Sequence, residues 1–578
     1  KIESDENESY KLVTGKNGIE ISAPTPEGIH NGCRTLLAVL AGQTFPLSLP
    51  AATIIDYPDF AYRGLHFDVA RNFTEKAEIL RLLDLMSLYK MNVLHFHLVD
   101  DEGWRLAIDG IDELTEVGSR RTHSPEASNS LYPFYGSGID GGLTGNGFYT
   151  RDEFKEILRY ATDRHIKVIP EIDVPGHSRA AIMAMNERYR RYIDSDSIKA
   201  TEYLLTDFDD KSQYRSVQDY NDCVMNIALP STYNFVKDVM TDVIKMYDEA
   251  GAPLDVIHVG GDEVPHGAWE GSPIAQAYMK EKGMDSTQQL RDEFLLRLHS
   301  FLSPQGIAIG GWQEILTKGD GKELNHSLPG HEMLSYSWNT SPDNDMDQLT
   351  YSLVNAGYPT VLCNVNNLYL DLSYSPNFMD PGFRWGGYVD EFVTFATNPY
   401  NIYASGVNLD DPESWKPELA DGKTQLLPDG KKNIAGLQGE LWSETLHNID
   451  MVQERLLPKV FGVAERAWNA TPEWQSYDEF VEACSKYASR TSLNEFDRLA
   501  RLGMSYRVAP PGLMIINGEL HANSPYPNAE IHYTLDGSEP TAMSPQWSEP
   551  VKISDSKIIR ARAFVNDRGS VITELFID

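Results

Sequence analysis

Two adjacent carboxylates, Asp262 and Glu263, follow a short apolar run and the glycine pair Gly260-Gly261. Neighbouring side chains of a regular strand point to opposite faces, but glycines allow the backbone to bend, so that both carboxylates can reach one cleft. Two carboxylates in one desolvated cleft do not ionise equally, because one stays protonated as an acid while the other stays anionic. Cleavage of a glycosidic bond needs that division of labour. The same motif also suits solvated acids at a strand-end turn, so the hypothesis needs support from the rest of the chain.

Further polar and aromatic residues stand where other apolar runs end. Each one alone is typical of a structural role, as a core ring, a cap or a solvated charge. Together they suit a sugar pocket, in which indole rings cover the apolar faces of the sugar while carboxylates and arginine bind its hydroxyls. These residues are Asp100, His177, Trp312, Trp338, Tyr369, Asp371, Trp442 and Glu444, with Arg63 near the start of the first run.

Eight short apolar runs, rich in β-branched residues, alternate with amphipathic segments. Near-continuous apolar character is typical of a parallel strand that is covered on both faces. Residues 75–89, 231–250 and 286–302 carry apolar side chains at helical spacing, and Thr150 and Glu153 form a capping box. This alternation predicts an α/β fold, a (β/α)₈ TIM barrel whose chemistry lies at the carboxyl ends of the strands. The eight runs are Tyr62–Asp68, Asn92–Leu98, Lys167–Asp173, Asp255–Gly260, Gly306–Gly311, Met333–Trp338, Thr360–Asn364 and Ala435–Glu440.

Two flanks differ from the repeating pattern, so we predict three domains. Residues 1–56 read as two strands and one helix, the remnant of an N-terminal α/β domain, and residues 57–505 form the barrel. Residues 506–578 show short alternating runs between turns, which predict a small C-terminal β-sandwich with a structural role. Segment 124–147 is expected to be a long loop on the active-site rim, and this loop and segment 377–404 are expected to shape the leaving-group side.

The charge, hydrophobicity and cysteine content of the sequence argue against several classes of binding partner. The formal net charge of −35 over 578 residues repels nucleic acid and anionic membranes. The sequence contains no run of 18 apolar residues, so we expect no membrane span. Its four cysteines form no CxxC pair, which argues against a zinc site or a disulfide framework. The sequence starts at Lys1 with no apolar signal core. We expect a protein exported to the periplasm, cell surface or medium after loss of its signal, although a cytoplasmic location stays open.

Several motifs, taken in order, resemble family 20 glycoside hydrolases, the β-N-acetylhexosaminidases and chitobiases. The resemblance extends from about Tyr57 to Arg501, and residues 506–578 are similar to the small C-terminal sandwich of chitobiase-like members. The motifs are Tyr62-Arg63-Gly64-Leu65 with Asp68 and Arg71, Leu94-His95-Phe96-His97 before Asp100-Asp101, Pro175-Gly176-His177, and His258-Val259-Gly260-Gly261-Asp262-Glu263.

The resemblance implies an exo-acting, retaining hydrolase of β-linked N-acetylhexosamine that needs no cofactor and no metal. It implies that Glu263 is the general acid/base, that Asp262 orients the substrate acetamido group, and that Tyr369 hydrogen-bonds the acetamido oxygen. The remaining assignments are Trp312, Trp338 and Trp442 as pocket walls, Arg63, Asp371 and Glu444 as hydroxyl ligands, and Asp100 with His177 as a pair that supports the acid. Gln313 departs from the family pattern, in which many members carry an acid. A preference for GlcNAc or GalNAc and the oligomeric state stay open.

Two other functions fit parts of the sequence. His95 and His97 share one strand face and resemble the HxH pair of metal-dependent amidohydrolases, and His177, His258 and Asp262 could complete such a site. A non-catalytic glycan-binding protein on a hydrolase barrel is the second alternative.

Overall fold

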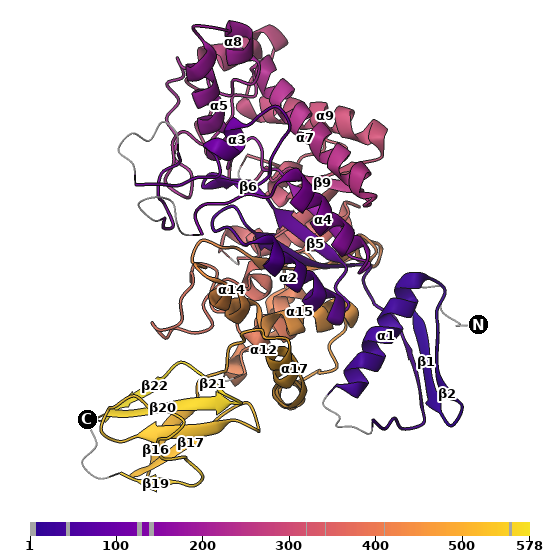
Figure 1. The fold of residues 1–578 in the computed structure, drawn as a ribbon, viewed down its shortest axis with the longest axis vertical. Coiled ribbons are helices and arrows are strands. Elements are labelled where there is room, and N and C mark those ends of the chain that lie inside the picture. The colour runs from indigo at the N-terminus through magenta and orange to yellow at the C-terminus, as the bar shows by residue number, and fades with distance from the viewer. Residues whose placement is uncertain are drawn as a thin grey trace.

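The computed structural model describes residues 7–41, 47–123, 130–137, 144–319, 321–341, 343–409, 411–553 and 558–577. Three parts follow one another along the chain: a small N-terminal α/β part, a central barrel and a C-terminal β part (Figure 1). Of the long loop predicted over 124–147, residues 124–129 and 138–143 lie outside the described residues.

The central part is a closed barrel of eight parallel strands, which confirms the predicted fold. Each strand falls on one of the eight predicted apolar runs. Every residue of the first two barrel strands is buried, as expected for strands covered on both faces. The strands are β4 (Tyr62–Asp68), β5 (Val93–His97), β8 (Lys167–Glu171), β9 (Val256–His258), β10 (Ala308–Trp312), β13 (Met333–Ser337), β14 (Thr360–Leu362) and β15 (Ile434–Leu441).

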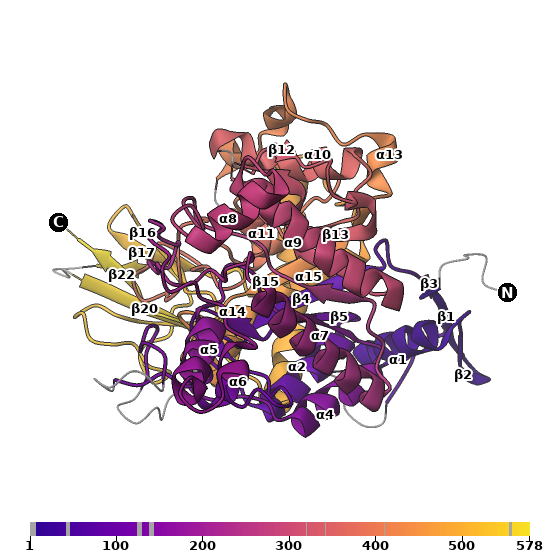
Figure 2. The ribbon, with the colours of Figure 1, turned by 90° about the horizontal axis from the view of Figure 1, so that it is seen from above.

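Amphipathic helices surround the strands. Viewed from above, β4, β5 and β15 lie near the centre, with α2, α7 and α9 among the helices around them (Figure 2). The predicted capping box is present, since the Thr150 hydroxyl accepts from the Glu153 amide while the Glu153 carboxylate accepts from the Thr150 amide. The longer helices of the outer ring are α2 (Lys76–Leu88), α4 (Arg151–Thr162), α7 (Pro230–Ala250), α9 (Thr287–Leu302), α10 (Leu349–Asn355) and α15 (Lys459–Trp468).

The other segments of the barrel domain carry additional strands and helices. The strands among them are β6 (Val99–Asp100), β7 (Gly103–Trp104), β11 (Thr317–Lys318) and β12 (Glu323–Leu324). The helices are α3 (Glu113–Glu116), α5 (Arg179–Tyr192), α6 (Ser197–Thr201), α8 (Pro273–Lys282), α11 (Val365–Leu368), α12 (Glu391–Phe395), α13 (Pro428–Lys431), α14 (Ile449–Leu456), α16 (Tyr477–Arg490) and α17 (Phe496–Arg501).

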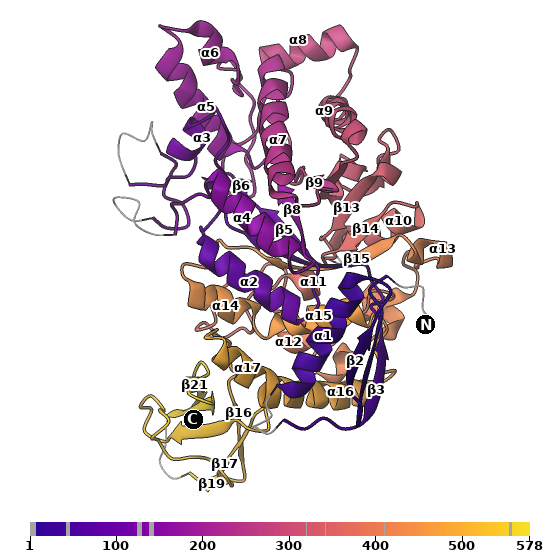
Figure 3. The same ribbon diagram turned by 45° about the vertical axis from the view of Figure 1, so that its right-hand side comes forward.

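The N-terminal part contains three strands rather than the predicted two. They are β1 (Tyr10–Gly15), β2 (Gly18–Ser22) and β3 (Ala52–Asp56), and they form an antiparallel sheet in the order β2-β1-β3. Helix α1 (Pro26–Leu40) lies along this sheet (Figure 3). Tyr10 and Leu12 pack against Trp468 of the barrel, so the small sheet shares a buried cluster with the larger domain.

The C-terminal part is built from two antiparallel sheets, as predicted. Burial alternates strictly along β20 (Ile558–Val565), the pattern of a strand with one face in the core. One sheet contains β16 (Gly512–Ile516), β17 (Glu519–Asn523) and β19 (Val551–Lys552). The other contains β18 (Glu530–Thr534), β20, β21 (Arg568–Gly569) and β22 (Thr573–Phe576).

Two predictions from composition can be compared with the structure. Every helix in the described part of the chain is too short or too polar to cross a bilayer. All four cysteines are free thiols, three of them buried, whereas Cys33 is exposed on α1.

Candidate active site

The carboxyl ends of the barrel strands surround a cavity of about 520 Å³. It is lined by ten of the eleven residues singled out from the sequence: Asp100, His177, Asp262, Glu263, Trp312, Trp338, Tyr369, Asp371, Trp442 and Glu444. They come from segments that follow seven different strands and lie up to 344 residues apart in number, from Asp100 to Glu444. The parallel barrel brings them together because all its strands end at the same rim.

Arg63 is the exception, and its assignment as a hydroxyl ligand is wrong. It is the second residue of β4, so it lies at the amino end of the barrel. Its side chain is buried and donates to the Glu8 carboxylate at 3.1 Å and to the Phe60 carbonyl at 2.8 Å. Its guanidinium carbon lies 5.2 Å from the Trp468 ring. Arg63 therefore joins the N-terminal sheet to the underside of the barrel.

Arg71 lines the cavity in its place. It follows the carboxyl end of β4, and its guanidinium contacts the carboxylates of Asp100 at 2.7 Å and Glu102 at 3.1 Å. The guanidinium carbon lies 5.0 Å from the centre of the Trp442 ring. Arg71 could have been predicted from the sequence, because it follows the first apolar run, and the active-site residues of such a barrel lie at the carboxyl ends of its strands.

The glycine pair before the two acids makes the bend that the sequence predicts. Gly260 and Gly261 have φ of 62° and 82°, a region that residues with a side chain rarely adopt. A Cβ atom on Gly260 would lie 1.9 Å from the carboxylate of Asp173, and one on Gly261 would lie 2.5 Å from Ile315. Glu263 itself has φ of 46°, a strained conformation that is common at functional sites. Both carboxylates therefore face the same cavity.

His177 connects these acids to Asp100. Its Nε2 atom lies 3.4 Å from a carboxylate oxygen of Glu263 and 3.8 Å from one of Asp262, and its Nδ1 atom lies 3.2 Å from Asp100. Burial opposes the charged imidazolium, but the carboxylates of Asp100 and Asp262 raise the pKa of His177 well above its usual value. His177 is therefore a cation between three acids.

Asp262 has the pKa that matters most for chemistry here. Burial raises the pKa of its carboxyl to about 7, and His177 opposes that rise. Asp100 behaves differently, because the cations Arg71 and His177 outweigh burial and lower its pKa. Of these two carboxylates, Asp100 is held toward its anionic form, whereas the charge of Asp262 depends on the cation beside it.

Indole rings form the walls of the cavity. Trp312 is almost fully buried, and its Nε1 donates to Glu171 at 3.0 Å, while its ring lies 5.6 Å from that of Trp442. Trp338 donates from Nε1 to Glu314 at 3.2 Å. Gln313, where the family pattern often has an acid, accepts from the Trp338 backbone amide at 3.1 Å. The amide oxygen of Gln313 therefore fixes the backbone that carries this wall.

Three further groups that line the cavity suit the polar substituents of a sugar. Tyr369 is buried beside Trp338, with ring centres 6.5 Å apart. Burial raises the pKa of Asp371 to about 7 and that of Glu444 to about 8. Carboxyl groups with such values can donate as well as accept a hydrogen bond near neutral pH.

Several cavity residues were not singled out from the sequence, although Tyr135, Phe383 and Trp385 fall within the two segments expected at the leaving-group side. Tyr135, Asp173, Phe383 and Trp385 line the cavity, and none follows a strand directly except Asp173. The Trp385 ring packs edge-on against those of Tyr369 and Trp338, at 5.8 and 6.1 Å. Nothing local distinguishes such loop aromatics from other exposed rings.

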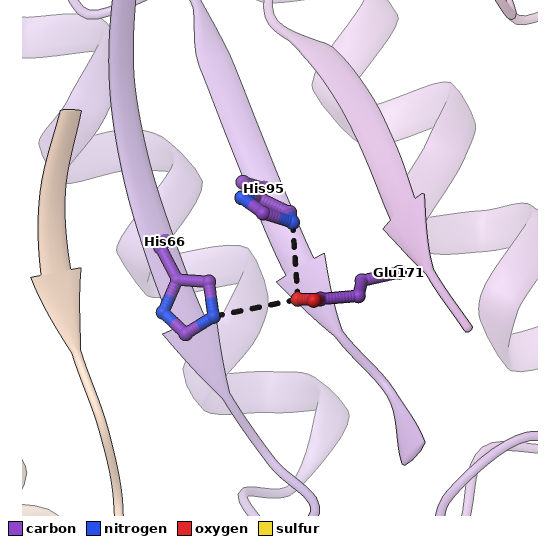
Figure 4. A group of neighbouring side chains, drawn as sticks. All are labelled: His66, His95 and Glu171. Carbon is purple, nitrogen blue, oxygen red and sulfur yellow. Dashed lines mark ion pairs between the residues drawn. The ribbon is translucent and has the colours of Figure 1, made fainter. Parts of the chain in front are cut away.

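The histidines of the HxH pair lie beneath the indole walls, inside the barrel. Both contact Glu171, whose Oε2 atom is 2.6 Å from His97 Nδ1 and 3.1 Å from His95 Nε2. His66 Nε2 lies 3.6 Å from the same oxygen, and Figure 4 shows the ion pairs of Glu171 with His66 and His95. His258 contacts the other oxygen at 2.9 Å.

Within the described chain, acids and histidines form four groupings with spacing that could hold a cation. None of them combines the HxH pair with His177, His258 and Asp262. The structure therefore does not assemble the metal site of the amidohydrolase alternative, and Glu171 accounts for the HxH pair as part of a buried network.

Comparison with known proteins agrees with this geometry. Residues 60–471 match the family model "Glycosyl hydrolase family 20, catalytic domain", and residues 520–576 match "Fn3 associated". The chain is 33% identical to a β-hexosaminidase of Vibrio vulnificus over 564 residues, covering 92% of this chain and 65% of the relative. It is 32% identical to the N,N'-diacetylchitobiase of Vibrio harveyi over 580 residues, covering 92% and 64%.

The fold has solved counterparts as well. The crystal structure of a GH20 exo-β-N-acetylglucosaminidase from Vibrio harveyi in complex with N-acetylglucosamine superposes with a TM-score of 0.67 at 29% identity, covering 87% of this chain and 68% of that one. The chain spans slightly less than two thirds of the length of the two curated relatives. The family model nevertheless covers most of the chain, so this protein belongs to glycosyl hydrolase family 20.

Proposed function

We propose that the protein is a retaining, exo-acting β-N-acetylhexosaminidase. It removes terminal, non-reducing, β-linked N-acetylhexosamine, either GlcNAc or GalNAc, from oligosaccharides or glycoconjugates. The observation that carries the proposal is the placement of Asp262 and Glu263, which share one indole-walled cavity and both approach His177. Membership of the family and the names of the relatives support the same activity.

Glu263 acts as the general acid and base. It protonates the glycosidic oxygen as the bond breaks and then takes a proton from the incoming water, a role that contributes about 10²–10⁴-fold to the rate. Its half-buried position at the cavity surface suits transfer to a leaving group, and the His177–Asp100 pair behind it orients it. Asp100 and His177 thus support the acid without a bond to substrate.

The nucleophile is the substrate's own acetamido oxygen. It attacks the anomeric carbon from the face opposite the leaving group and forms a cyclic oxazolinium ion, which water then opens with overall retention. A neighbouring group held in the reactive geometry has an effective molarity on the order of 10⁵–10⁸ M. The rings of Trp312, Trp338 and Trp442 enclose the space that would hold this arm, and Tyr369 offers a hydroxyl to its carbonyl oxygen.

Asp262 stabilises the positive charge that develops on the acetamido nitrogen. Only its anionic form does this, and its pKa of about 7 means that a nearby positive charge shifts it toward that form. Asp371, Glu444 and Arg71 remain for the hydroxyls of the terminal sugar. Glycosidases that use the substrate in this way are an exception to the scheme with two catalytic carboxylates on opposite faces.

The test compares aryl β-N-acetylglucosaminide with the matched β-glucoside, which lacks the acetamido group. We expect turnover of the first only, and a product that keeps the β configuration at early times by NMR. Glu263→Gln should reduce kcat by at least about 10²-fold while N-acetylglucosamine still binds. Comparable rates on the two aryl glycosides would exclude substrate assistance, and sugar binding without any turnover by the wild type would favour a glycan-binding protein. A panel of β-linked disaccharides then separates GlcNAc from GalNAc preference.

A further inference from the structure

One wall of the cavity has no regular secondary structure. Residues 371–390 form neither helix nor strand, yet Phe383 and Trp385 from this segment line the cavity. The tip of the segment is open to solvent, with Phe378 78% exposed. Without a backbone ladder, the order of such a segment depends on its side-chain contacts. The contacts that hold it therefore decide the shape of the cavity.

The segment folds back tightly on the backbone beside Asp371. A Cβ atom on Gly382 would lie 2.7 Å from the Asp371 carbonyl oxygen. The Ser373 amide donates to the Phe383 carbonyl at 2.9 Å, and the Ser373 hydroxyl donates to the Asp380 carbonyl at 3.1 Å. A shift of Asp380 would therefore move both the aromatic wall and the backbone next to a proposed sugar ligand.

The carboxylate of Asp380 is bound by an arginine from outside the catalytic barrel. Arg507, in the linker between α17 and β16, donates from Nη2 to both carboxylate oxygens at 2.9 and 2.8 Å. Both side chains are largely buried, and the guanidinium carbon lies 4.0 Å from the centre of the Tyr374 ring. The Arg507 amide donates to the Leu457 carbonyl at 3.0 Å, which fixes the linker on the barrel. Arginine–carboxylate pairs of this kind are strong and directional.

The C-terminal β part contacts the same segment and is packed firmly on the barrel. The side-chain Nδ2 of Asn377 donates to the Ile572 carbonyl at 3.4 Å. Tyr526 and Val565 belong to the same buried hydrophobic cluster as the barrel core, and the Tyr526 hydroxyl donates to Glu391 at the start of α12. In Figure 1 the yellow strands lie next to α12 and α17. This part of the chain therefore packs both on the barrel and against the segment.

We propose that Arg507 is a positioning residue: by binding Asp380, it clamps residues 373–387 between the barrel and the C-terminal β part and so holds Phe383 and Trp385 in the cavity wall. In this arrangement the C-terminal part contributes to substrate binding without touching the sugar. The effect on catalysis rests on the proposed hexosaminidase function, whereas the clamp itself does not.

The test uses Arg507→Met, which removes the guanidinium, and Arg507→Lys, which keeps the charge without the two-pronged contact. Arg568→Met is the matched control, because Arg568 crosses the same interface to Glu454 at 3.1 Å without contacting Asp380. Hydrogen–deuterium exchange of the Ser373 and Val389 amides measures the clamp, since these amides donate to Phe383 and Ser373 within the segment. We expect at least tenfold faster exchange in Arg507→Met, a smaller effect in Arg507→Lys and wild-type exchange in the control.

Kinetics on an aryl N-acetylglucosaminide and on a β-linked disaccharide give the second readout. We expect kcat/KM to fall at least tenfold in Arg507→Met, mainly through KM and more for the disaccharide. If that variant does not fold, Asp380→Ala removes the same contact from the barrel side and should give the same exchange pattern. Wild-type exchange in Arg507→Met, or equal loss in Arg568→Met, would overturn the proposal. An inactive wild type would refute the proposed function, while the exchange data would still decide the clamp.

Discussion

Replacing His177 with asparagine should shift the pH dependence of turnover rather than only reduce the rate. His177 is the cation nearest to Asp262, with 3.8 Å between Nε2 and the carboxylate oxygen. At an effective dielectric constant of about 20, charges this far apart attract by about 4 kcal/mol, which corresponds to about three pKa units. Asp100, 3.2 Å from the other ring nitrogen, offsets part of the imidazolium charge, so the expected change is about one to two units.

The sign follows from the charge that is removed. A positive neighbour favours the carboxylate, so its loss raises the pKa of Asp262 from about 7 to about 8–9. At the upper value only about a hundredth of Asp262 is ionised at pH 7, and the developing positive charge of the substrate loses its partner. The acid limb of the kcat/KM profile should therefore move to higher pH by about one to two units, and activity should partly recover in alkaline buffer.

The assay is kcat/KM for an aryl β-N-acetylglucosaminide, measured from acidic to alkaline pH for wild type, His177→Asn and a control. His299→Asn is a suitable control, because His299 pairs with Glu332 on the outside of the barrel. A profile that falls uniformly, with its acid limb in the wild-type position, would refute the argument that His177 sets the charge of Asp262.

Two further substitutions test the geometry of the site. Arg71→Met should abolish measurable turnover and destabilise the protein by about 3–5 kcal/mol, because the buried carboxylates of Asp100 and Glu102 lose their cation. Steady-state kinetics and urea unfolding check the two effects, and wild-type stability would contradict this account. Gly261→Ala should lower kcat/KM by about 10²-fold, because a side chain is disfavoured at its φ of 82° and the Cβ atom, 2.5 Å from Ile315, would displace the two acids. Steady-state kinetics of the folded variant measures this loss. Full activity would show that the bend before the acids tolerates a side chain.

The sequence alone predicted the eight barrel strands and most of the residues singled out for the site. Each of the eight strands is a short, nearly continuous apolar run. This pattern can be recognised without knowing which strands pair with one another. Residues that follow those runs directly, such as Asp262, Glu263 and Trp312, meet at one rim because parallel strands all end there. The bend before the two acids could also be predicted, because two adjacent glycines allow backbone conformations that other residues rarely adopt.

The assignment of Arg63 as a hydroxyl ligand was wrong because Arg63 lies at the amino end of its strand, whereas the site lies at the carboxyl ends. Arg63 is the second residue of β4 and Arg71 follows the strand, so the barrel places them at opposite ends although only eight positions separate them. The direction rule for parallel strands would have favoured Arg71.

Other features were decided only by the tertiary structure. Trp385 and Arg507 lie in segments without periodicity, and their roles depend on which distant surfaces those segments meet. The pKa of Asp262 likewise depends on burial and on a cation from another strand end. Apolar periodicity is a property of neighbouring residues and can be read along the chain, whereas charge environment and loop position arise from contacts between residues that are brought together only by folding.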